Sequence, residues 1–534
     1  MILIPLLLSL SPQAIDVPDG LLGGARPENF AVLLVDDWGL DMLEIYGTAD
    51  LSDQCITRPP TPNIDALIDS GVTFLNGWVH PVCSPTRASL LTGRMAYRHK
   101  LGRVVDQECS FAGSGCPTPD ALSDSEFTIP EMLREAWQVG LAPRYGSAAL
   151  GKWHLGPDPV APLIQGFDRF RGSQHNIARA DNPTETYCNW LKNSDGAFSM
   201  SQTYATTDSV DEALAFIADQ GSEPWFLYMA FHAGHAPWHM PPAHLAPSYF
   251  IADGAGGAFH AQEPSCPVRP GTCPPQVFPL PPCSPACDLP LTEPLLDQVA
   301  AKRPYYEAMI EALDTEIGRL LAGIDLTTTT IFLLGDNGTP GSVTSRPFLG
   351  DRTLGLPPKS KGSIFQGGVN VPFIVAGAGV RGSRAGRGPR TSKQLVHVVD
   401  IYATIADFVG IDEDVLAAIS PNELDSKSFR DILSRKRSQG RTTMLCEGFA
   451  PNFPNSADPC QFSIQRAIRN RRYKLMRSSN LFDCTAPDIE QMYDLSIDPY
   501  EFNDLIASGA HLTAGTVQQQ YLRLKAELDA TPLP

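Results

Sequence analysis

The sequence predicts an α/β protein in which helices sandwich a large, mostly parallel sheet, followed by a smaller C-terminal α+β domain. Short β-type apolar runs alternate with amphipathic helical stretches from about residue 29 to residue 397, a pattern typical of parallel sheets covered on both faces. The length of 534 residues favours about two to four domains at roughly 150 residues each. The chain is 43% apolar and 19% charged, which supplies a large core and excludes a disordered or coiled-coil chain.

The predicted elements of the large sheet follow one another in chain order. Its strands are the apolar runs Phe30–Val35, Ala148–Leu150, Trp225–Phe231, Thr330–Leu334 and Val371–Ala376. Its helices are the amphipathic stretches Pro62–Ser70, Ile129–Trp137, Asp208–Asp219 and Tyr305–Ala322. Residues 240–295 are dominated by Pro, Gly and Cys and have no periodicity, which indicates a long insertion or lid loop.

A second unit follows at about Asp425. Its predicted elements are the strands Thr442–Cys446, Ser463–Arg469 and Tyr473–Met476 and the closing helix Val517–Leu528. We therefore expect an N-terminal extension over residues 1–24, an α/β domain over residues 25–424 and a small-sheet subdomain over residues 425–534.

The N-terminus and the cysteines favour export. Residues 1–14 begin with an apolar run that is shorter than the ~20 residues of a membrane span. The run resembles a short signal peptide without its positive n-region; a disordered N-terminus or a misassigned start codon is the alternative. No other run is apolar and long enough to span a membrane. The twelve cysteines favour disulfides in an oxidising compartment, with Cys109–Cys116 and Cys446–Cys460 as predicted bridges. Zinc ligation is the weaker alternative, because no CxxC pair is present.

The charge balance limits the partners. The formal net charge is −18, which argues against nucleic acid as a partner because nucleic-acid binding depends on a basic surface. An acidic protein of this kind binds an anion only through a local cationic pocket.

Polar side chains follow the predicted strands at their carboxyl ends, where ligands bind in open α/β sheets. They are Asp36, Asp37, Lys152, His154, His232, His235, Asp336 and Asn337. Three carboxylates and an amide provide oxygen ligands, which suit Ca²⁺ or Mg²⁺ better than zinc. Taken singly, each of these residues is also explained as a helix cap or turn residue.

Cys83 opens a segment that predicts a helix. Pro85 suits the first turn, and Gly93 ends the helix. The helix N-terminus would place Cys83 where the free N–H groups favour an anion, with Arg87 one turn further on. The alternative is a half-cystine in a loop.

The segment from Cys83 to Arg94, with Cys-x-Pro-x-Arg at its start, resembles the signature of the sulfatase family. The likeness extends over nearly the whole chain in the same order. It includes Asp36-Asp37, Gly151-Lys152-Trp153-His154-Leu155-Gly156, His235-Ala236-Pro237, Asp336-Asn337-Gly338, Lys361 ahead of Gln366-Gly367-Gly368, His397 to Thr404, and Tyr493-Asp494-Leu495 with Asp498-Pro499. The resemblance implies an alkaline-phosphatase-like fold and an arylsulfatase-like activity.

Four positions depart from the family pattern. Thr86 stands where Ser is commonest, and Ala403 replaces a usual Pro. Gln366 and Asn370 stand in place of Glu and Arg, which puts in doubt any ion pair that those residues form in relatives. None of these changes removes a residue to which we assign chemistry.

The resemblance implies a mechanism that depends on oxidation of Cys83 to formylglycine by a maturation enzyme. In this mechanism a cation, held by Asp36, Asp37, Asp336, Asn337 and residue 83, activates the formylglycine hydrate, and Asp336 accepts its proton. The remaining roles are stabilisation of the sulfuryl oxygens by Arg87, Lys152 and Lys361, protonation of the leaving alcohol by His235 or Lys361, and removal of the last proton by His154. His232 has no such match.

Two alternatives to sulfate ester hydrolysis stay open at the level of sequence. The same fold and metal serve phosphate or phosphonate ester hydrolysis. A protein whose Cys83 stays a thiol would instead be a non-catalytic metal-binding module. Sulfated small molecules and sulfated carbohydrates both fit the core as substrates.

The compartment and the cation are further expectations. The only Asn-x-Ser/Thr triplet without proline, Asn337-Gly338-Thr339, lies in the predicted metal site, where a glycan would block the ion. We therefore expect a bacterial periplasmic or secreted protein. We expect Ca²⁺ rather than Mg²⁺, because calcium tolerates an irregular shell of oxygen ligands.

Overall fold

The structure is a computed structural model. It describes residues 28–47, 58–105, 120–177, 185–249, 251–252, 258–259, 295–349, 358–383, 387–436, 440–450, 452, 463–479 and 487–534. The predicted N-terminal extension, most of the 240–295 insertion and the Cys109–Cys116 bridge lie outside these residues. Among the described helices, none is both long and apolar enough to cross a membrane.

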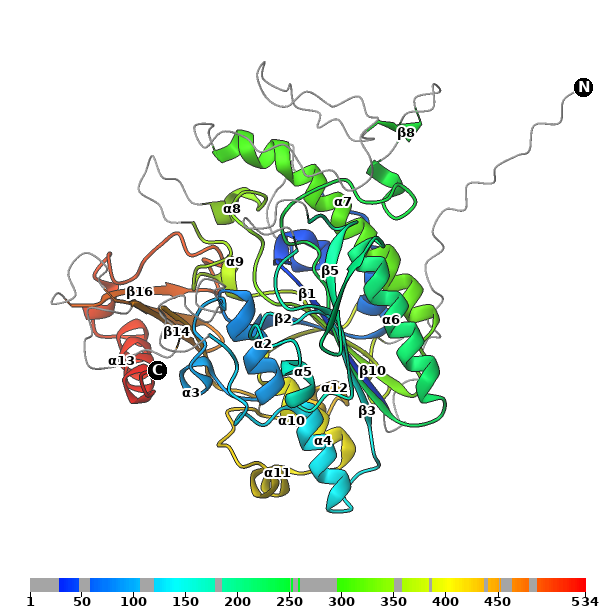
Figure 1. Cartoon of the computed structure of the whole chain (residues 1–534). Helices are drawn as coiled ribbons and strands as arrows, with labels where there is room; N and C mark the ends of the chain where they lie inside the picture. The colour runs from blue at the N-terminus through cyan, green and yellow to red at the C-terminus, as the bar shows by residue number, and fades with distance from the viewer. Residues whose placement is uncertain are drawn as a thin grey trace, which may run out of the picture.

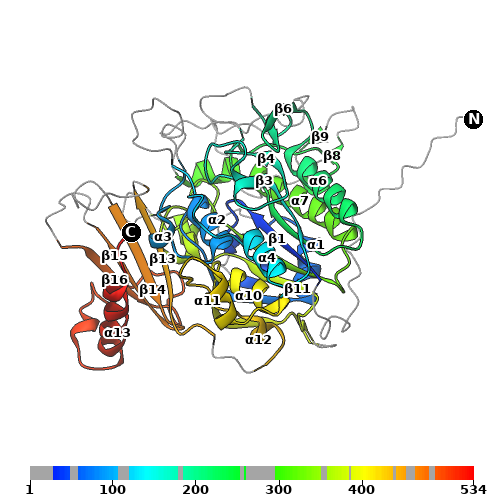
Figure 2. The ribbon, with the colours of Figure 1, turned by 60° about the horizontal axis from the view of Figure 1, so that its bottom comes forward.

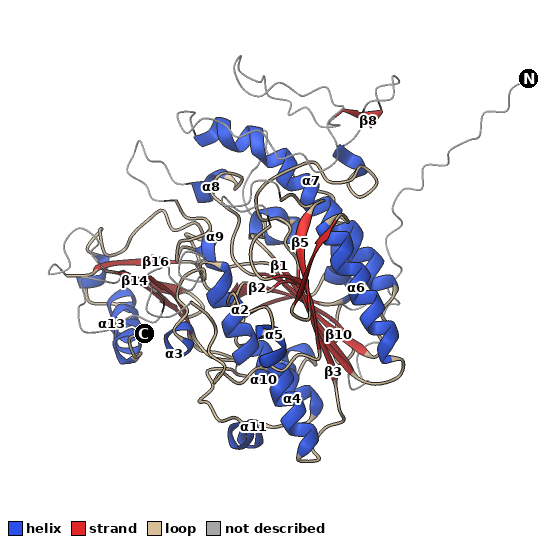
Figure 3. Cartoon of the chain, in the orientation of Figure 1, coloured by secondary structure: helices blue, strands red, loops and turns tan. Residues whose placement is uncertain are grey.

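The larger of the two main sheets has ten strands and confirms the predicted α/β class (Figure 3). In spatial order the strands are β12 (Thr391–His397), β2 (Val72–Trp78), β11 (Phe373–Gly377), β10 (Thr329–Gly335), β1 (Asn29–Val35), β7 (Trp225–Ala230), β3 (Gly146–Lys152), β4 (Arg169–Ser173), β5 (Trp190–Ser194) and β6 (Ala197–Ser201). Only β11 and β5 run against the other eight. All five strands predicted from apolar runs are present.

Strand β1 shows why helices cover both faces of this sheet. Successive side chains of a strand point to opposite faces, and every residue of β1 from Phe30 to Val35 is buried. Ala31, Leu33 and Val35 belong to one hydrophobic core, whereas Phe30, Val32 and Leu34 belong to another. A strand that is apolar on both sides needs cover on both sides, and this explains the unbroken apolar run in the sequence.

The helices divide between these two cores. Helices α1 (Pro62–Ser70), α6 (Ala205–Gln220) and α7 (Leu295–Ala322) contribute to the first core. Helices α2 (Cys83–Thr92), α4 (Ile129–Gln138) and α10 (Asp400–Val409) contribute to the second. Figure 1 shows α6 and α7 along one side of the sheet and α4 and α10 on the other.

Short elements connect these layers. They are α3 (Ala96–His99), α5 (Ala161–Ile164), α8 (Arg346–Leu349), α9 (Gln366–Val369), α11 (Glu413–Ile419), α12 (Arg430–Leu433), the small strands β8 (Ile251–Ala252) and β9 (Ala258–Phe259), and single 3₁₀ turns at 40–42, 44–46, 247–249 and 510–512.

The smaller main sheet is antiparallel and lies beside the first, as Figure 2 shows. It consists of β13 (Met444–Ala450), β14 (Ser463–Arg469), β15 (Tyr473–Ser478) and β16 (Ile489–Asp494), and helix α13 (Thr516–Ala530) accompanies it. One face packs on the large domain through a cluster that contains Trp78 and Met476. The other face packs on α13 through Leu475 and Leu524, so this sheet is held between the large domain and the last helix.

One cysteine prediction is wrong. Cys446 is a buried free thiol, so the predicted Cys446–Cys460 bridge is absent. Cys446 lies in the middle of β13, inside the cluster that joins the small sheet to the large domain. Its side chain acts there as a small apolar group.

Candidate active site

The predicted site residues meet at the carboxyl edge of the large sheet. Asp36 and Asp37 follow β1, and Asp336 follows the neighbouring strand β10. One ligand atom from each of Asp36, Asp37, Cys83 and Asp336 lies within 4.8 Å of the others. All four residues are buried. The Asp37 amide donates to Asp336 Oδ1 at 3.1 Å, which ties the two loops together.

Helix α2 places Cys83 in this cluster. The helix begins at Cys83 after Val82 in an extended conformation, and it ends at Gly93, whose φ of 68° is in the left-handed region that glycine tolerates. Every residue of the helix is buried, so its position is fixed by packing on all sides. The Cys83 thiol donates to Asp36 Oδ1 at 3.4 Å. Burial and the carboxylates of Asp336 and Asp36 raise the pKa of this thiol.

Three cations surround the carboxylates. The Arg87 guanidinium donates to Asp336 Oδ2 through Nε at 3.1 Å and through Nη2 at 2.7 Å. Lys152 pairs with Asp36, and Lys361 pairs with Asp37. Three positive and three negative charges therefore balance. A divalent cation added to this cluster would leave it positive and able to attract an anionic ester.

The pairing separates the pKa values of two neighbouring carboxyl groups. Burial alone would raise the pKa of Asp36, but Lys152, His235 and Arg87 outweigh burial and hold it well below its usual range. Burial and the negative charge of Asp36 raise the pKa of Asp336 to about 6, against the opposing effect of Arg87.

The histidines differ in their surroundings. His154 has φ of 57°, a left-handed conformation that costs energy in a residue with a β-carbon, and Ser84 Oγ holds its carbonyl at 2.8 Å. His154 Nδ1 is buried without a hydrogen-bond partner among the described residues. His232 Nδ1 likewise has no partner among the described residues, but its Nε2 lies 2.9 Å from Ser173 Oγ. Burial lowers the pKa of His232 and of His235 to about 3.

His235 and Lys361 are the accessible members of the cluster. Their side chains are 22% and 19% exposed, whereas Arg87, Lys152 and His154 are 3% exposed or less. His235 Nε2 lies 3.9 Å from Asp37 Oδ2. The Lys361 amide donates to the Thr339 carbonyl at 3.1 Å, which holds this loop next to Asp336 and Asn337. These two side chains therefore form the solvent-facing side of the site.

The donor set fits a hard divalent cation. Asn337 is fully buried, and its Nδ2 donates to Asp37 Oδ1 at 2.8 Å. Its Oδ1 has no hydrogen-bond partner among the described residues, although a buried carbonyl oxygen ordinarily has one. An oxygen left open beside three carboxylates is what a Ca²⁺ or Mg²⁺ ligand requires.

A buried hydrogen-bond network that the sequence did not predict supports the loops after β1 and β10. Asp41 accepts from Arg303 Nη1 at 2.8 Å, from Thr339 Oγ1 at 2.6 Å and from the Ser345 amide at 2.9 Å. Thr339 Oγ1 also accepts from the Gly39 amide at 3.1 Å. Asp41 is 262 residues from Arg303, so no local pattern could have revealed the pair. These bonds join the loop after β1 to the loop after β10.

Two tyrosines are further supports without a sequence signal. Tyr306 donates its hydroxyl hydrogen to the Asp37 carbonyl at 2.7 Å. The Tyr187 hydroxyl lies 2.7 Å from the carbonyls of His232 and His235. Both hydroxyl groups bond to backbone carbonyls of site residues, and they therefore fix the positions of Asp37, His232 and His235.

The departure at Gln366 has a structural explanation. Gln366 Oε1 accepts from Trp78 Nε1 at 3.0 Å, and the backbone N–H of Gln366 donates to Glu501 Oε2 at 2.6 Å. Lys474 Nζ pairs with the other oxygen of Glu501. In this chain Glu501 supplies the buried carboxylate and Gln366 supplies a neutral acceptor. Gln366 therefore takes part in the joint between the two sheets.

The cluster of carboxylates and cations, which includes the N-terminal residue of a buried helix, could hold a divalent cation, and such a site suits an anionic ester. The family model described as "Sulfatase" matches residues 28–411. The chain belongs to the sulfatase family.

Individual relatives agree with this assignment. Human N-acetylgalactosamine-6-sulfatase is 33% identical over 239 residues, which cover 41% of this chain and 41% of the relative. The chain thus matches about two fifths of the length of that relative. An arylsulfatase of the sea urchin Hemicentrotus pulcherrimus is 26% identical over 95% of this chain and 84% of its own length.

Solved structures share the fold. The putative sulfatase yidJ from Bacteroides fragilis superposes with a TM-score of 0.65 at 17% identity, covering 97% of both chains. A protein solved in complex with its substrate D-glucosamine-2-N,6-O-disulfate superposes with a TM-score of 0.61 at 19% identity, covering 94% of this chain and 97% of that one.

Proposed function

We propose that this protein hydrolyses sulfate esters to an alcohol and inorganic sulfate. The observation that carries the proposal is the position of Cys83. It opens the buried helix of a Cys-x-Pro-x-Arg segment and lies within 4.8 Å of three carboxylates that suit a divalent cation. Membership of the sulfatase family supports the same reaction.

Four side chains would hold the cation: Asp36, Asp37, Asp336 and Asn337, together with an oxygen on residue 83. Ca²⁺ is the proposed ion, because two adjacent aspartates and an amide give an irregular oxygen shell. When bound, it supplies positive charge to the oxygens of the sulfate group. Conversion of Cys83 to formylglycine by a maturation enzyme supplies a hydrated nucleophile whose second hydroxyl can expel sulfate.

The two cations Arg87 and Lys361 have different proposed roles. Arg87 is fully buried, and its donors are engaged by Asp336 and by the Lys152 carbonyl at 2.7 Å. It therefore orients Asp336, which is the proposed proton acceptor. Lys361 is partly exposed, and the charge of Asp37 raises its pKa although burial alone would lower it. Lys361 thus remains a cation that can contact the sulfate oxygens.

Proton transfers to and from the substrate involve the remaining polar side chains. His235 and Lys361 face solvent and are the proposed donors to the departing alcohol. Lys361 is the one that stays protonated near pH 7, because the lowered pKa of His235 leaves its ring neutral. His154 is the proposed base that restores the aldehyde, since its Nδ1 has no competing partner among the described residues. Lys152 stays paired with Asp36 and adds positive charge behind the reacting group.

The proposed substrates are sulfated carbohydrates or sulfated small molecules. The support is that one structural neighbour binds a disulfated glucosamine as its substrate. We also propose that the protein is exported by a bacterium. Asn337 and Thr339, the ends of the glycosylation triplet, are 0% and 1% exposed, so the triplet offers no accessible acceptor in the folded chain.

The test combines three variants with mass spectrometry of the Cys83 peptide. Cys83→Ala should keep the fold and lower kcat/KM for 4-nitrophenyl sulfate by at least about 10³-fold, because the nucleophile is lost. Cys83→Ser should react once and accumulate a sulfated enzyme. Cys446→Ala is the matched control, since it removes another buried free thiol and should keep activity.

The rival phosphoesterase is tested in the same assay. Formylglycine-containing enzyme should act faster on 4-nitrophenyl sulfate than on 4-nitrophenyl phosphate. The proposal fails if protein shown by mass to carry only the Cys83 thiol turns over the sulfate at the rate of converted enzyme.

A further inference from the structure

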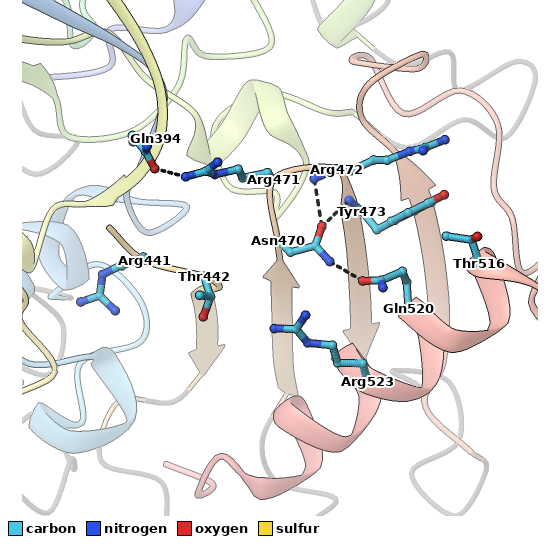
Figure 4. Close-up of a pocket in the computed structure, with 10 residues that line it drawn as sticks. All are labelled: Gln394, Arg441, Thr442, Asn470, Arg471, Arg472, Tyr473, Thr516, Gln520 and Arg523. Carbon is cyan, nitrogen blue, oxygen red and sulfur yellow. Dashed lines mark hydrogen bonds between the residues drawn. The ribbon is translucent and has the colours of Figure 1, made fainter. Parts of the chain in front are cut away.

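A second cation-rich place lies between the two main sheets, away from the candidate active site. It is a cavity of 750 Å³ at the junction of β12, β13, the β14–β15 turn and α13 (Figure 4). It is lined by Gln394, Arg441, Thr442, Asn470, Arg471, Arg472, Tyr473, Thr516, Gln520 and Arg523. Four of these ten residues are arginines and none is an aspartate or glutamate.

The β14–β15 turn gives the cavity a fixed wall. Asn470 Oδ1 accepts from the amides of Arg472 at 2.9 Å and Tyr473 at 2.8 Å. Asn470 Nδ2 donates to Gln520 Oε1 at 2.8 Å, which ties the turn to α13. In Figure 4, Arg471 and Arg523 extend toward the side where Gln394 and Thr442 lie, whereas Arg472 turns away.

The four arginines are not equally available to a ligand. Arg441 pairs with Asp400, and Arg472 pairs with Asp494. Arg523 is 51% exposed, and among the residues that the structure describes its ion-pair partner is Glu527 of its own helix, at 3.0 Å. Such exposed pairs contribute little and open readily.

Arg471 is the most available cation. It is exposed, and its side chain donates to Gln394 Oε1, a neutral amide. The described residues give it no carboxylate partner.

The cavity is separate from the candidate active site. Arg469, the residue before the turn, pairs with Met444 at the start of β13. Toward the other end of β13, Gly448 lies next to Pro81, two residues before Cys83. Gly448 is four steps along the strand from Met444, which is roughly 13 Å at about 3.3 Å per residue. None of the lining residues belongs to the metal cluster.

We propose that this cavity is an accessory site for the sulfate groups of a sulfated oligosaccharide, with Arg471 and Arg523 as its ligands. Arginine binds such oxyanions through paired N–H donors, and Thr442, Thr516 and Gln520 add neutral donors around them. The choice of a sulfated glycan rests on the proposed function. The chain has a net charge of −18, which disfavours a polyanion over much of its surface, so a cavity whose ten lining residues include four arginines and no carboxylate directs where that polyanion docks.

The test measures binding and hydrolysis separately. Binding is followed by fluorescence anisotropy with a labelled chondroitin-6-sulfate hexasaccharide, in a Cys83→Ala background that prevents cleavage. Arg471→Gln with Arg523→Gln should weaken binding about tenfold at low salt, because two charge-assisted contacts are lost. The effect should shrink at 300 mM NaCl, since screening weakens exposed charges.

A matched control removes two exposed arginines elsewhere. Arg134 and Arg144 are 50% and 66% exposed, and their ion pairs within the described part of the chain are long, at 3.7 Å. Arg134→Gln with Arg144→Gln should therefore bind the probe like the parent. Thr442→Asp, which adds a carboxylate at an exposed position of the cavity, should weaken binding without removing an arginine. Melting curves check that each variant is folded.

The outcomes separate this proposal from the proposed function. The accessory site is refuted if the Arg471/Arg523 variant binds the hexasaccharide as the control does. It is also refuted if the Arg471/Arg523 variant loses binding of inorganic sulfate, measured by thermal shift, but keeps binding of the hexasaccharide. The cavity would then be a site for small oxyanions. Hydrolysis of 4-nitrophenyl sulfate by converted enzyme tests the proposed function alone and should be equal in the parent and the Arg471/Arg523 variant.

Discussion

The two cation-rich regions of the molecule differ in how their charges are held. At the edge of the large sheet, Arg87 and Lys152 are buried and each is paired with a carboxylate. In the cavity beside α13, Arg471 and Arg523 are exposed and weakly paired. Buried pairs cost desolvation when the chain folds, but they leave the charges fixed in place. Exposed arginines cost little and stay free to exchange partners with solvent or ligand.

This difference matches the demands of two kinds of site. Chemistry needs charges that are already oriented when the substrate arrives, because reorganisation adds to the barrier. A site that docks a large anion needs side chains that extend to the ligand and can release it again. Holding buried charges in place requires a supporting network, which here includes Asp41 and Arg303. The comparison therefore predicts large effects at the buried edge and small ones at the exposed cavity.

Loss of one metal-site carboxylate should have the largest effect. Asp37→Ala removes a proposed ligand and leaves Lys361 without its carboxylate partner. We expect kcat/KM to fall by at least about 100-fold, the metal content to drop and the melting temperature to decrease. Elemental analysis and thermal melts measure these changes, with the exposed Asp211→Ala as control. An unchanged metal content in Asp37→Ala would refute the ligand assignment.

Two arginine substitutions compare the regions directly. Arg303→Met breaks the buried bonds to Asp41 and Glu307 and should cost about 3–5 kcal/mol of unfolding free energy, because a buried charge loses its partner. Arg523→Met breaks an exposed pair within one helix and should cost less than about 0.5 kcal/mol. Urea unfolding measures both. Equal costs would contradict the contrast between fixed and exchangeable charges.

The sequence predicted what depends on local patterns. Apolar runs such as Phe30–Val35 identify central strands because burial on both faces requires them. The helix from Cys83 to Thr92 follows from Pro85 and Gly93. Strand β12 was missed, since exposed and half-buried residues occupy its first half. Nor does the apolar run of β11 say that it lies antiparallel to β10.

The site was predictable only in part, for the same reason. Its charged residues follow strands whose carboxyl ends meet, so their convergence could be expected. The partners of these residues could not, because bonds such as Asp41–Arg303 join segments far apart in the chain. The Cys446 prediction failed because the sequence placed this thiol in a strand but did not show that the large domain covers it. The sequence also could not show that Lys361 is partly exposed whereas Lys152 is buried, because exposure depends on how the chain packs.

A buried acid at the joint between the sheets gives a smaller, pH-dependent test. Glu447 is fully buried and accepts from the Tyr97 amide at 2.6 Å, with Arg466 Nε 3.3 Å away. Burial raises its pKa to about 7, although Arg466 opposes the shift. The folded chain therefore binds more protons than the unfolded chain between about pH 4.5 and 7. Stability from this group must fall as the pH rises through that window and level off above it.

Glu447→Gln, which mimics the protonated acid, should remove this dependence. Between pH 5.5 and pH 8 the parent should lose about 2 kcal/mol more unfolding free energy than the variant. Urea unfolding at the two pH values measures the difference, and Glu413→Gln on the exposed first turn of α11 should behave like the parent. If instead the parent and the variant showed the same pH dependence between pH 5.5 and pH 8, Glu447 would be an ionised partner of Arg466 across this range. This part of the small sheet would then resemble the charge-paired edge of the large sheet, with a fixed ion pair between the neighbouring strands β13 and β14.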